Sequence, residues 1–348
     1  MLVLVVLLAV FGLAVLLSTS EYNGRVRFGD SAYYFKKQLF ATALGMGVMY
    51  AVTVMDYHFF LKLAPAAYLL SMLLSTAVLL FGQEINGSKR WLNLGALSFQ
   101  PSEFAKVAVI LFLAWQIERT KERTDGFWFM CRTMLTLLPI VGLVGSNNLS
   151  TAIIILGIGV ILIFVSNPKY MQFIGLGGAG VSFIAVFLAA ESYRLERLAI
   201  WRNPEKYEKG YQTLQGLYAI GSGGVFGVGI GNSVQKLGFV PEAQNDMIFS
   251  IICEELGLAG AGIIVFLFLL LIWRFFLIAS GSRDLFGALI ATGAMAHMMI
   301  QVILNIAVVT NTIPNTGITL PFISYGGTSV MFLLIEMGLV LSVSQVVD

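Results

Sequence analysis

Residues 256–278 read LGLAGAGIIVFLFLLLIWRFFLI, and Arg274 is the single charged side chain in this run. A helix needs about 20 predominantly apolar residues to cross the hydrocarbon core of a bilayer, and the run is long enough. It also lacks the alternation of lipid-facing and lumen-facing residues that a membrane barrel strand shows. The run therefore predicts a membrane-spanning helix.

Similar apolar runs recur along the whole chain. The ten candidate spans are Leu2–Leu17, Leu39–Met55, Leu63–Phe81, Phe104–Ile117, Phe127–Val144, Leu149–Val165, Tyr170–Ala190, Leu256–Ile278, Leu285–Val309 and Val330–Val347. They predict an all-α polytopic integral membrane protein. The fourth run is short, and its helix is expected to begin earlier, near Leu97. Because Met1–Ser18 lacks the basic start of a cleavable leader, we interpret it as the first membrane helix.

Composition supports the same class. Of the 348 residues, 58% are apolar and 11% are charged, whereas soluble domains have roughly 45–50% and about 25%. So few charges cannot cover a water-facing surface, which excludes a soluble globular enzyme, a disordered chain and a nucleic-acid binder with a basic face. Cys131 and Cys253 lie far apart, as do His58 and His297, so neither a disulfide framework nor a zinc or di-iron centre is expected.

Two connections differ from the short loops between the other runs. Segment 191–245 is long and contains the glycine-rich stretch Ser222–Asn232, and long connections tend to carry function. Segment 310–328 carries no charge. Non-helical backbone at membrane depth must be buried in protein or line a cavity, so 310–328 is expected to dip back into the bundle. The Lys and Arg counts of the loops leave the orientation of the chain open.

Ionisable side chains in or beside the spans are the best candidates for function, because each is unfavourable by about 2.5–3.5 kcal/mol at the bilayer centre. Glu103 and Lys106 share one helix face, where they can form a structural ion pair or line a polar pocket. Asp246 precedes an apolar run and is either the N-cap of that helix or a functional carboxylate. His297 and Glu336 are interpreted as residues that hydrogen bond between helices.

Several motifs are typical of one family of bacterial membrane proteins. They are Asn86–Gly95 (NGSKRWLNLG), Phe99–Lys106 (FQPSEFAK), Gly210–Gln215, Ser222–Gly224, Gln235–Lys236, Pro241–Glu242, Asp246–Phe249 (DMIF) and Pro314–Gly327 (PNTGITLPFISYGG). Together they resemble the SEDS family (shape, elongation, division and sporulation proteins), which includes RodA, FtsW and SpoVE. The resemblance covers nearly the whole chain. It implies one membrane domain over residues 1–348 in the bacterial inner membrane, with ten spans and both termini in the cytoplasm.

The resemblance also implies an activity. SEDS proteins are peptidoglycan glycosyltransferases that polymerise lipid II, an undecaprenyl-diphosphate-linked disaccharide-pentapeptide, into β-1,4 glycan at the outer face of the membrane during elongation, division or sporulation. They work with a class B penicillin-binding protein. The family's catalytic carboxylate falls on Asp246, which would act as the general base. The chain departs from the family pattern at Gln244-Asn245, where many members have His-Thr, and at Asn147-Asn148, where Pro-Asp is common.

A lipid diphosphate requires cations, for which Arg offers bidentate geometry. The substrate-binding candidates are Arg90, Trp91, Glu103, Lys106, Arg194, Arg197, Arg202, Lys236 and Glu242. The alternative for each outer-loop charge is a solvated loop residue, and the alternative for Trp91 is an anchor at the membrane interface. No tightly bound cofactor is expected, although Mg²⁺ or Mn²⁺ could assist at the diphosphate.

Two other functions are compatible with the sequence. One is a lipid II flippase, which the polar residues within the spans and the large outer loop would suit. A flippase should need polar groups through the full membrane depth, whereas the charges here gather near the outer half. The other is a non-catalytic scaffold for a penicillin-binding protein.

Overall fold

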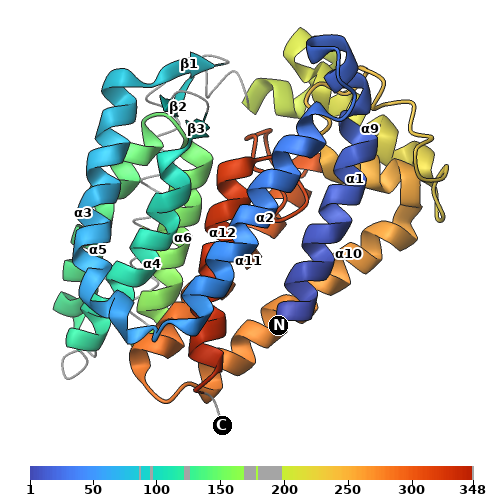
Figure 1. The fold of residues 1–348 in the computed structure, drawn as a ribbon. Coiled ribbons are helices and arrows are strands. Elements are labelled where there is room, and N and C mark those ends of the chain that lie inside the picture. The colour runs from blue at the N-terminus through green and yellow to red at the C-terminus, as the bar shows by residue number, and fades with distance from the viewer. Residues whose placement is uncertain (86–87, 95–96, 121–125, 168–177, 179–197, 347–348) are drawn as a thin grey trace.

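The computed structural model describes residues 1–85, 88–94, 97–120, 126–167, 178 and 198–346. Most of these residues are helical (Figure 1). The helices are α1 (Leu2–Phe28), α2 (Tyr33–Val54), α3 (His58–Phe81), α4 (Pro101–Arg119), α5 (Phe127–Gly145), α6 (Leu149–Ser166), α9 (Tyr211–Gly223), α10 (Ile248–Gly281), α11 (Leu285–Val309) and α12 (Gly327–Ser344).

The helices agree with the predicted spans. Within the described residues, nine of the ten predicted spans coincide with helices, and seven helices are long and apolar enough to cross a membrane. The protein is therefore a polytopic helical membrane protein. The predicted span Tyr170–Ala190 lies outside the described residues, apart from Gly178.

A small antiparallel sheet lies between α3 and α4, and the sequence analysis did not predict it. Its strands are β1 (Gln83–Ile85), β2 (Ser88–Leu94) and β3 (Leu97–Phe99), in that order. The expected start of the fourth span near Leu97 is wrong, because Leu97–Phe99 is strand. Helix α4 begins at Pro101, whose fixed φ suits the first helical turn. The sheet covers one end of the bundle (Figure 1).

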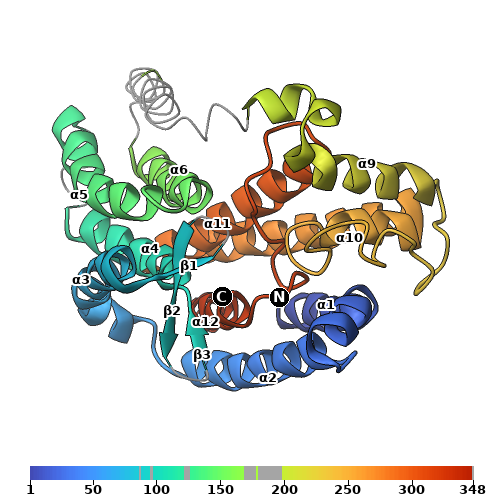
Figure 2. The same ribbon diagram turned by 90° about the horizontal axis from the view of Figure 1, so that it is seen from above.

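Helix α12 lies inside a ring of other helices (Figure 2), and it contacts α2, α4, α10 and α11. It packs most closely along α2. A Cβ atom on Gly338 would lie 2.8 Å from the carbonyl oxygen of Met49, and one on Gly45 would lie 2.7 Å from Leu334. Small residues at such positions let the backbones of membrane helices approach each other.

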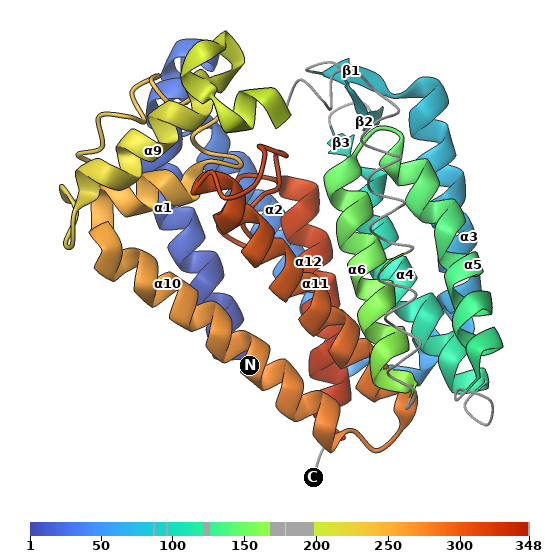
Figure 3. The same ribbon diagram turned by 180° about the vertical axis from the view of Figure 1, so that it is seen from behind.

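Helix α10 runs obliquely along one side of the molecule (Figure 3) and is interrupted at Gly257, where φ is 68° and ψ is −169°. The break frees two backbone carbonyls from the helical pattern. The N–H of Val228 donates to the carbonyl of Glu254 at 2.9 Å, and the N–H of Gly229 donates to that of Glu255 at 3.0 Å. The loop after α9 therefore supplies hydrogen-bond donors to the two carbonyls that the break leaves free. Backbone polar groups within a membrane protein need such partners.

The uncharged segment between α11 and α12 is non-helical and folds in among the helices. Its buried residues are Ile318, Leu320, Pro321, Phe322, Ile323 and Ser324. The N–H of Tyr325 donates to the carbonyl of Gln244 at 2.9 Å. This segment thus brings the end of the chain against the turn that precedes α10.

Candidate active site

Asp246 lies in the turn that leads into α10, and the residue is 9% exposed. The helix begins at Ile248, and Met247 rather than Asp246 occupies the N-cap position. The capping interpretation of Asp246 is therefore wrong. Gln212 of α9 donates from Nε2 to Asp246 Oδ1 at 3.5 Å, so the carboxylate faces α9.

The backbone around Asp246 is fixed by α11. Asn305 Nδ2 donates to the carbonyl oxygen of Asp246 at 2.9 Å and to that of Ile318 at 2.7 Å. One buried amide therefore joins the turn before α10 to the segment between α11 and α12. Gly317 of that segment has φ of 70°, and a Cβ built on it would lie 3.9 Å from Asp246 Oδ2. The segment thus passes beside the carboxylate at a position without a side chain.

Glu103 and Lys106 form a buried ion pair in α4. Lys106 Nζ lies 3.0 Å from Glu103 Oε2, and Lys106 is 2% exposed. The same Nζ donates to Gln301 Oε1 of α11 at 3.0 Å. The structure thus brings the two residues together as a structural ion pair within α4, and Lys106 also hydrogen bonds to α11. Their predicted contact with substrate stays a prediction.

The prediction that His297 and Glu336 hydrogen bond between helices is confirmed. His297 Nδ1 lies 2.8 Å from Glu336 Oε2 of α12, and His297 Nε2 lies 2.8 Å from Gln301 Oε1. Gln301 Nε2 in turn donates to the carbonyl of Thr319 at 3.0 Å. This network holds the non-helical segment between α11 and α12 in place.

Sequence reasoning missed Gln301 and Asn305. His297, Gln301 and Asn305 are spaced four residues apart, which places them on one face of α11. This polar stripe on an otherwise apolar span could have identified both residues, because polar side chains in membrane helices usually face a hydrogen-bond partner or a cavity.

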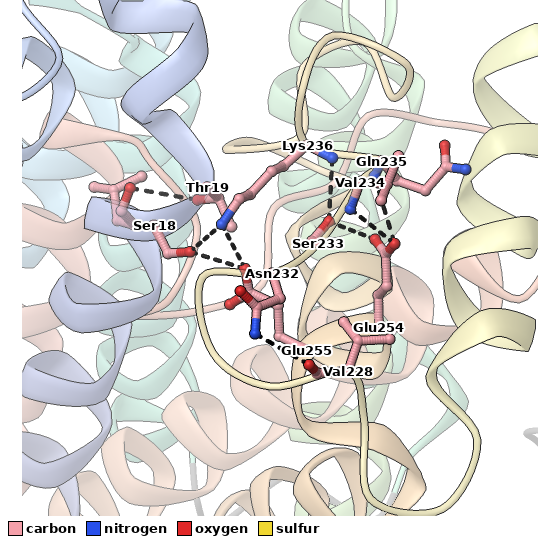
Figure 4. Close-up of polar contacts among 11 residues, drawn as sticks. Ser18, Thr19, Val228, Asn232, Ser233, Val234, Gln235, Lys236, Glu254 and Glu255 are labelled. Carbon is pink, nitrogen blue, oxygen red and sulfur yellow. Dashed lines mark hydrogen bonds and ion pairs between the residues drawn. The ribbon is translucent and has the colours of Figure 1, made fainter.

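Lys236 belongs to a buried network that joins α1, the loop after α9 and α10 (Figure 4). Its Nζ lies 2.7 Å from Glu255 Oε1 and donates to Ser18 Oγ at 2.8 Å. Glu254 accepts hydrogen bonds from the hydroxyl of Ser233 and from the N–H of Val234. Lys236 therefore positions its loop in this structure. Its predicted role in binding a diphosphate stays a prediction.

Arg90 and Trp91 lie on β2. Arg90 Nε donates to the carbonyl of Asn147 at 3.1 Å, which ties β2 to the connection between α5 and α6. Asn148 Oδ1 caps α6 by accepting from the N–H of Thr151 at 3.2 Å. An asparagine at position 148 thus keeps the capping role that a carboxylate could fill.

The remaining candidates are dispersed. Arg202 is exposed and follows Trp201, whose Nε1 donates to the carbonyl of Asn311 at 2.9 Å. This contact places Arg202 near the start of the segment between α11 and α12. Arg194 and Arg197 lie outside the described residues.

Glu242 and Gln244 connect the turn before Asp246 to the end of α1. Arg27 pairs with Glu242 at 3.4 Å on the surface, and Asn23 Nδ2 donates to Gln244 Oε1 at 2.8 Å. Gln244, which stands where the family often has His, is thus a structural link. Among the residues that the structure describes, no three His, Cys, Asp or Glu side chains converge on a metal site.

Comparisons with known proteins agree on one family. Residues 1–348 match the model of the FtsW, RodA and SpoVE family, described as cell cycle protein. The chain is 37% identical to stage V sporulation protein E of Bacillus subtilis and covers 95% of that protein, with 99% of this chain aligned. It is also 37% identical to a probable peptidoglycan glycosyltransferase FtsW of Thiomicrospira cyclica, with 98% of this chain and 90% of that protein aligned.

Solved structures are similar over nearly the whole chain. One is a chain of a peptidoglycan synthase complex that coordinates polymerization and crosslinking, with a TM-score of 0.84, 29% identity, and coverage of 99% of this chain and 96% of that one. Another is the rod shape determining protein RodA of Thermus thermophilus, with a TM-score of 0.73, 28% identity, and coverage of 99% and 95%.

Proposed function

Because the chain belongs to the FtsW, RodA and SpoVE family of cell cycle proteins, we propose that it is a peptidoglycan glycosyltransferase that polymerises lipid II, with Asp246 as the general base. The names of its relatives support the activity. The observation that carries the assignment of Asp246 is its position. It is a largely buried carboxylate that does not occupy the N-cap position of α10 and lies where α9, α10, α11 and the segment between α11 and α12 meet.

The proposed reaction is a single inverting displacement. The hydroxyl oxygen of the acceptor sugar attacks C1 of the donor sugar, and the bond between C1 and the diphosphate oxygen breaks. The hydroxyl proton passes to Asp246, and the electron pair leaves with undecaprenyl diphosphate. A positioned base is needed because a sugar hydroxyl is a weak nucleophile. A diphosphate leaves without protonation, so the paired carboxylates of glycoside hydrolases are not required.

The orientation of the chain belongs to the same proposal. The sheet, α9 and Asp246 would face the outside of the cell, and both termini would lie in the cytoplasm. Figure 1 is compatible with this orientation, because α1 begins and α12 ends away from the end that bears the sheet. A class B penicillin-binding protein would crosslink the glycan.

The described acidic residues do not fit a resident metal. We therefore assign no step to one, and Mg²⁺ or Mn²⁺ would arrive with the diphosphate of the substrate.

The test is Asp246→Asn in purified protein supplied with lipid II and Mg²⁺, with glycan products resolved on a gel. Polymerisation should fall by about 10²-fold or more, because losing a general base removes about 10²–10⁴ in rate. Asp30→Asn is the matched control. Asp30 is an acid on the surface that pairs with Lys36 at 2.8 Å. Normal polymerisation by Asp246→Asn would contradict the assignment.

The same preparation separates the alternatives. A flippase would move labelled lipid II across vesicles without making polymer. A scaffold would show neither activity, and polymer would appear only when a catalytic partner is added.

A further inference from the structure

A buried polar cluster joins α4, α11 and α12. His297 of α11 and Glu336 of α12 are each 1% exposed, and Lys106 and Gln301 are each 2% exposed. Helix α12 lies inside the ring of helices (Figure 2). At such burial, each hydrogen-bond donor needs an acceptor within the protein. The geometry of the cluster therefore indicates which atoms carry protons.

The amide of Gln301 has one orientation that its neighbours accept. Its Oε1 lies 3.0 Å from Lys106 Nζ, which only donates, and its Nε2 lies 3.0 Å from the carbonyl oxygen of Thr319, which only accepts. The reverse orientation would place two donors together at one end and two acceptors at the other. Because Gln301 Oε1 also lies 2.8 Å from His297 Nε2, that ring nitrogen must carry a proton and donate it.

A further proton is required between His297 Nδ1 and Glu336 Oε2, which are 2.8 Å apart. Without it, the lone pair of Nδ1 would face a carboxylate oxygen, and the two acceptors would repel each other. With two protons there instead of one, the second would lie on Glu336 Oε1, which has no hydrogen-bond partner among the described residues. One shared proton is therefore the state that fits the geometry.

The charges of the cluster agree with this count. With one shared proton, His297 and Glu336 are neutral as a pair, whichever of the two atoms holds it. Glu103 and Lys106 balance each other at 3.0 Å. The cluster is then neutral overall, whereas loss of the shared proton would leave one uncompensated negative charge inside the bundle, which is strongly unfavourable.

Other charged side chains on the helices packed against α11 and α12 have different surroundings. Glu254 and Glu255 bond to the loop after α9. Glu118 lies in the last turn of α4. The remaining ones, Lys36, Lys37, Arg119 and Arg274, are exposed. The charges that contact the cluster in the described residues are thus those of Glu103 and Lys106.

The cluster also reaches the segment beside Asp246. His297 and Lys106 hold Gln301 Oε1, which leaves Gln301 Nε2 directed at the carbonyl of Thr319. Gly317, two residues earlier, passes beside Asp246. Because this segment joins α11 to α12, the contact between His297 and Glu336 also fixes the two helices that carry its ends.

We propose that His297 and Glu336 are positioning residues that hold one shared proton inside the bundle and thereby fix the segment beside Asp246. The effect on catalysis rests on the glycosyltransferase function proposed above. Free imidazole and carboxyl groups lack this proton above about pH 7.5, so the folded chain binds one proton more than the unfolded chain. Stability therefore falls as the pH rises from there, and the equilibrium constant for unfolding increases by about tenfold per pH unit.

The experiment is equilibrium unfolding of the full chain in detergent micelles between pH 6 and 9. In Glu336→Gln, the new amide can donate to His297 Nδ1 and keeps the contact, but it has no proton to lose. Between about pH 7.5 and 8.5, the unfolding constant of the wild type should rise about tenfold more than that of Glu336→Gln. Glu21→Gln is the matched control, because Glu21 pairs with Arg25 on the surface, and it should behave like the wild type. Equal slopes for all three proteins would overturn the proposal.

Imidazole ¹⁵N NMR tests the same proton if Glu336→Gln does not fold. The chain has two histidines, and His58 is exposed, so His58→Gln leaves His297 as the single labelled ring. At pH 8 we expect a proton on Nε2 and a hydrogen-bonded proton at Nδ1. A ring without a proton on Nε2, or with the Nδ1 signal of a free neutral imidazole, would overturn the proposal.

Kinetics of polymerisation test the positioning role. Glu336→Gln should keep kcat at pH 7, whereas Glu336→Leu, which cannot hydrogen bond to His297, should lower kcat per folded protein about tenfold or more with KM for lipid II little changed. Equal kcat for these two variants would refute the positioning role. A wild type with the expected unfolding slope that makes no glycan at any pH would refute the glycosyltransferase function alone.

Discussion

Individual charged residues show how burial changes an interpretation based on sequence. Lys236 follows the glycine-rich stretch, and the sequence placed it among solvated or phosphate-binding cations. In the structure it is 5% exposed and pairs with Glu255, which is 3% exposed. Sequence could not reveal this pair, because Lys236 and Glu255 meet only when the loop after α9 folds back onto α10. Asp246 could be singled out, since its motif is specific.

Breaking the pair of Lys236 and Glu255 should destabilise the protein strongly. Lys236→Met leaves a buried carboxylate without its cation, which is unfavourable by about 3–5 kcal/mol. Lys236→Met/Glu255→Met should recover most of this loss, because two apolar side chains replace both charges. Thermal unfolding in detergent measures the difference. Equal destabilisation by the single and double variants would show that the ion pair is not the cause.

Secondary-structure elements were predicted unevenly. The apolar runs predicted helices because length and hydropathy suffice to define a span. The sheet was missed although Asn86-Gly87, a strong hairpin signal, falls between β1 and β2. Strands β1 and β3 have only three residues each, and the seven residues of β2 do not alternate between apolar and polar. The break in α10 was also missed, since Gly257, Gly260 and Gly262 in an apolar run are typical of helix packing.

Gly257→Ala tests the break in α10. A Cβ there would lie 2.4 Å from the N atom of Gly227 and 2.4 Å from the carbonyl oxygen of Val225. The backbone conformation is also one that only glycine adopts readily, and such strain amounts to about 1–3 kcal/mol. We expect a clear drop in the unfolding temperature. Gly262→Ala in the same helix meets nothing within 4 Å and should be nearly neutral. Similar unfolding temperatures for both variants would contradict this account.

At the scale of the whole molecule, the polar stripe of α11 holds the centre together. Gln301 and Asn305 fix the non-helical segment before α12, and Asn305 also fixes the backbone of Asp246. Because segment 310–328 carries no charge, the sequence predicted that it enters the bundle. It did not predict which side chains hydrogen bond to the segment there. Gln301 and Asn305 lie on the helix directly before the segment, but their contacts form only when the chain folds back onto α11, so only the packed bundle identifies them.

Asn305→Leu tests whether Asn305 positions Asp246, the proposed general base. It leaves two buried carbonyls without their donor, at about 1–3 kcal/mol each. We expect kcat for polymerisation, normalised to folded protein, to fall about tenfold or more with KM for lipid II little changed. Thr292→Val is the control, because the hydrogen bond that Thr292 forms among the described residues stays within α11, to the carbonyl of Ala288. Loss of folded protein with normal kcat would indicate a purely structural role.

The interrupted helix has a consequence for biogenesis. The amides that bond to the carbonyls of Glu254 and Glu255 belong to Val228 and Gly229, which are synthesised before them. A nascent chain therefore carries the donors already when the discontinuity emerges from the insertion machinery. Helix α10 can then enter the lipid without exposing backbone carbonyls that lack hydrogen-bond donors. No segment synthesised later is needed to supply those donors.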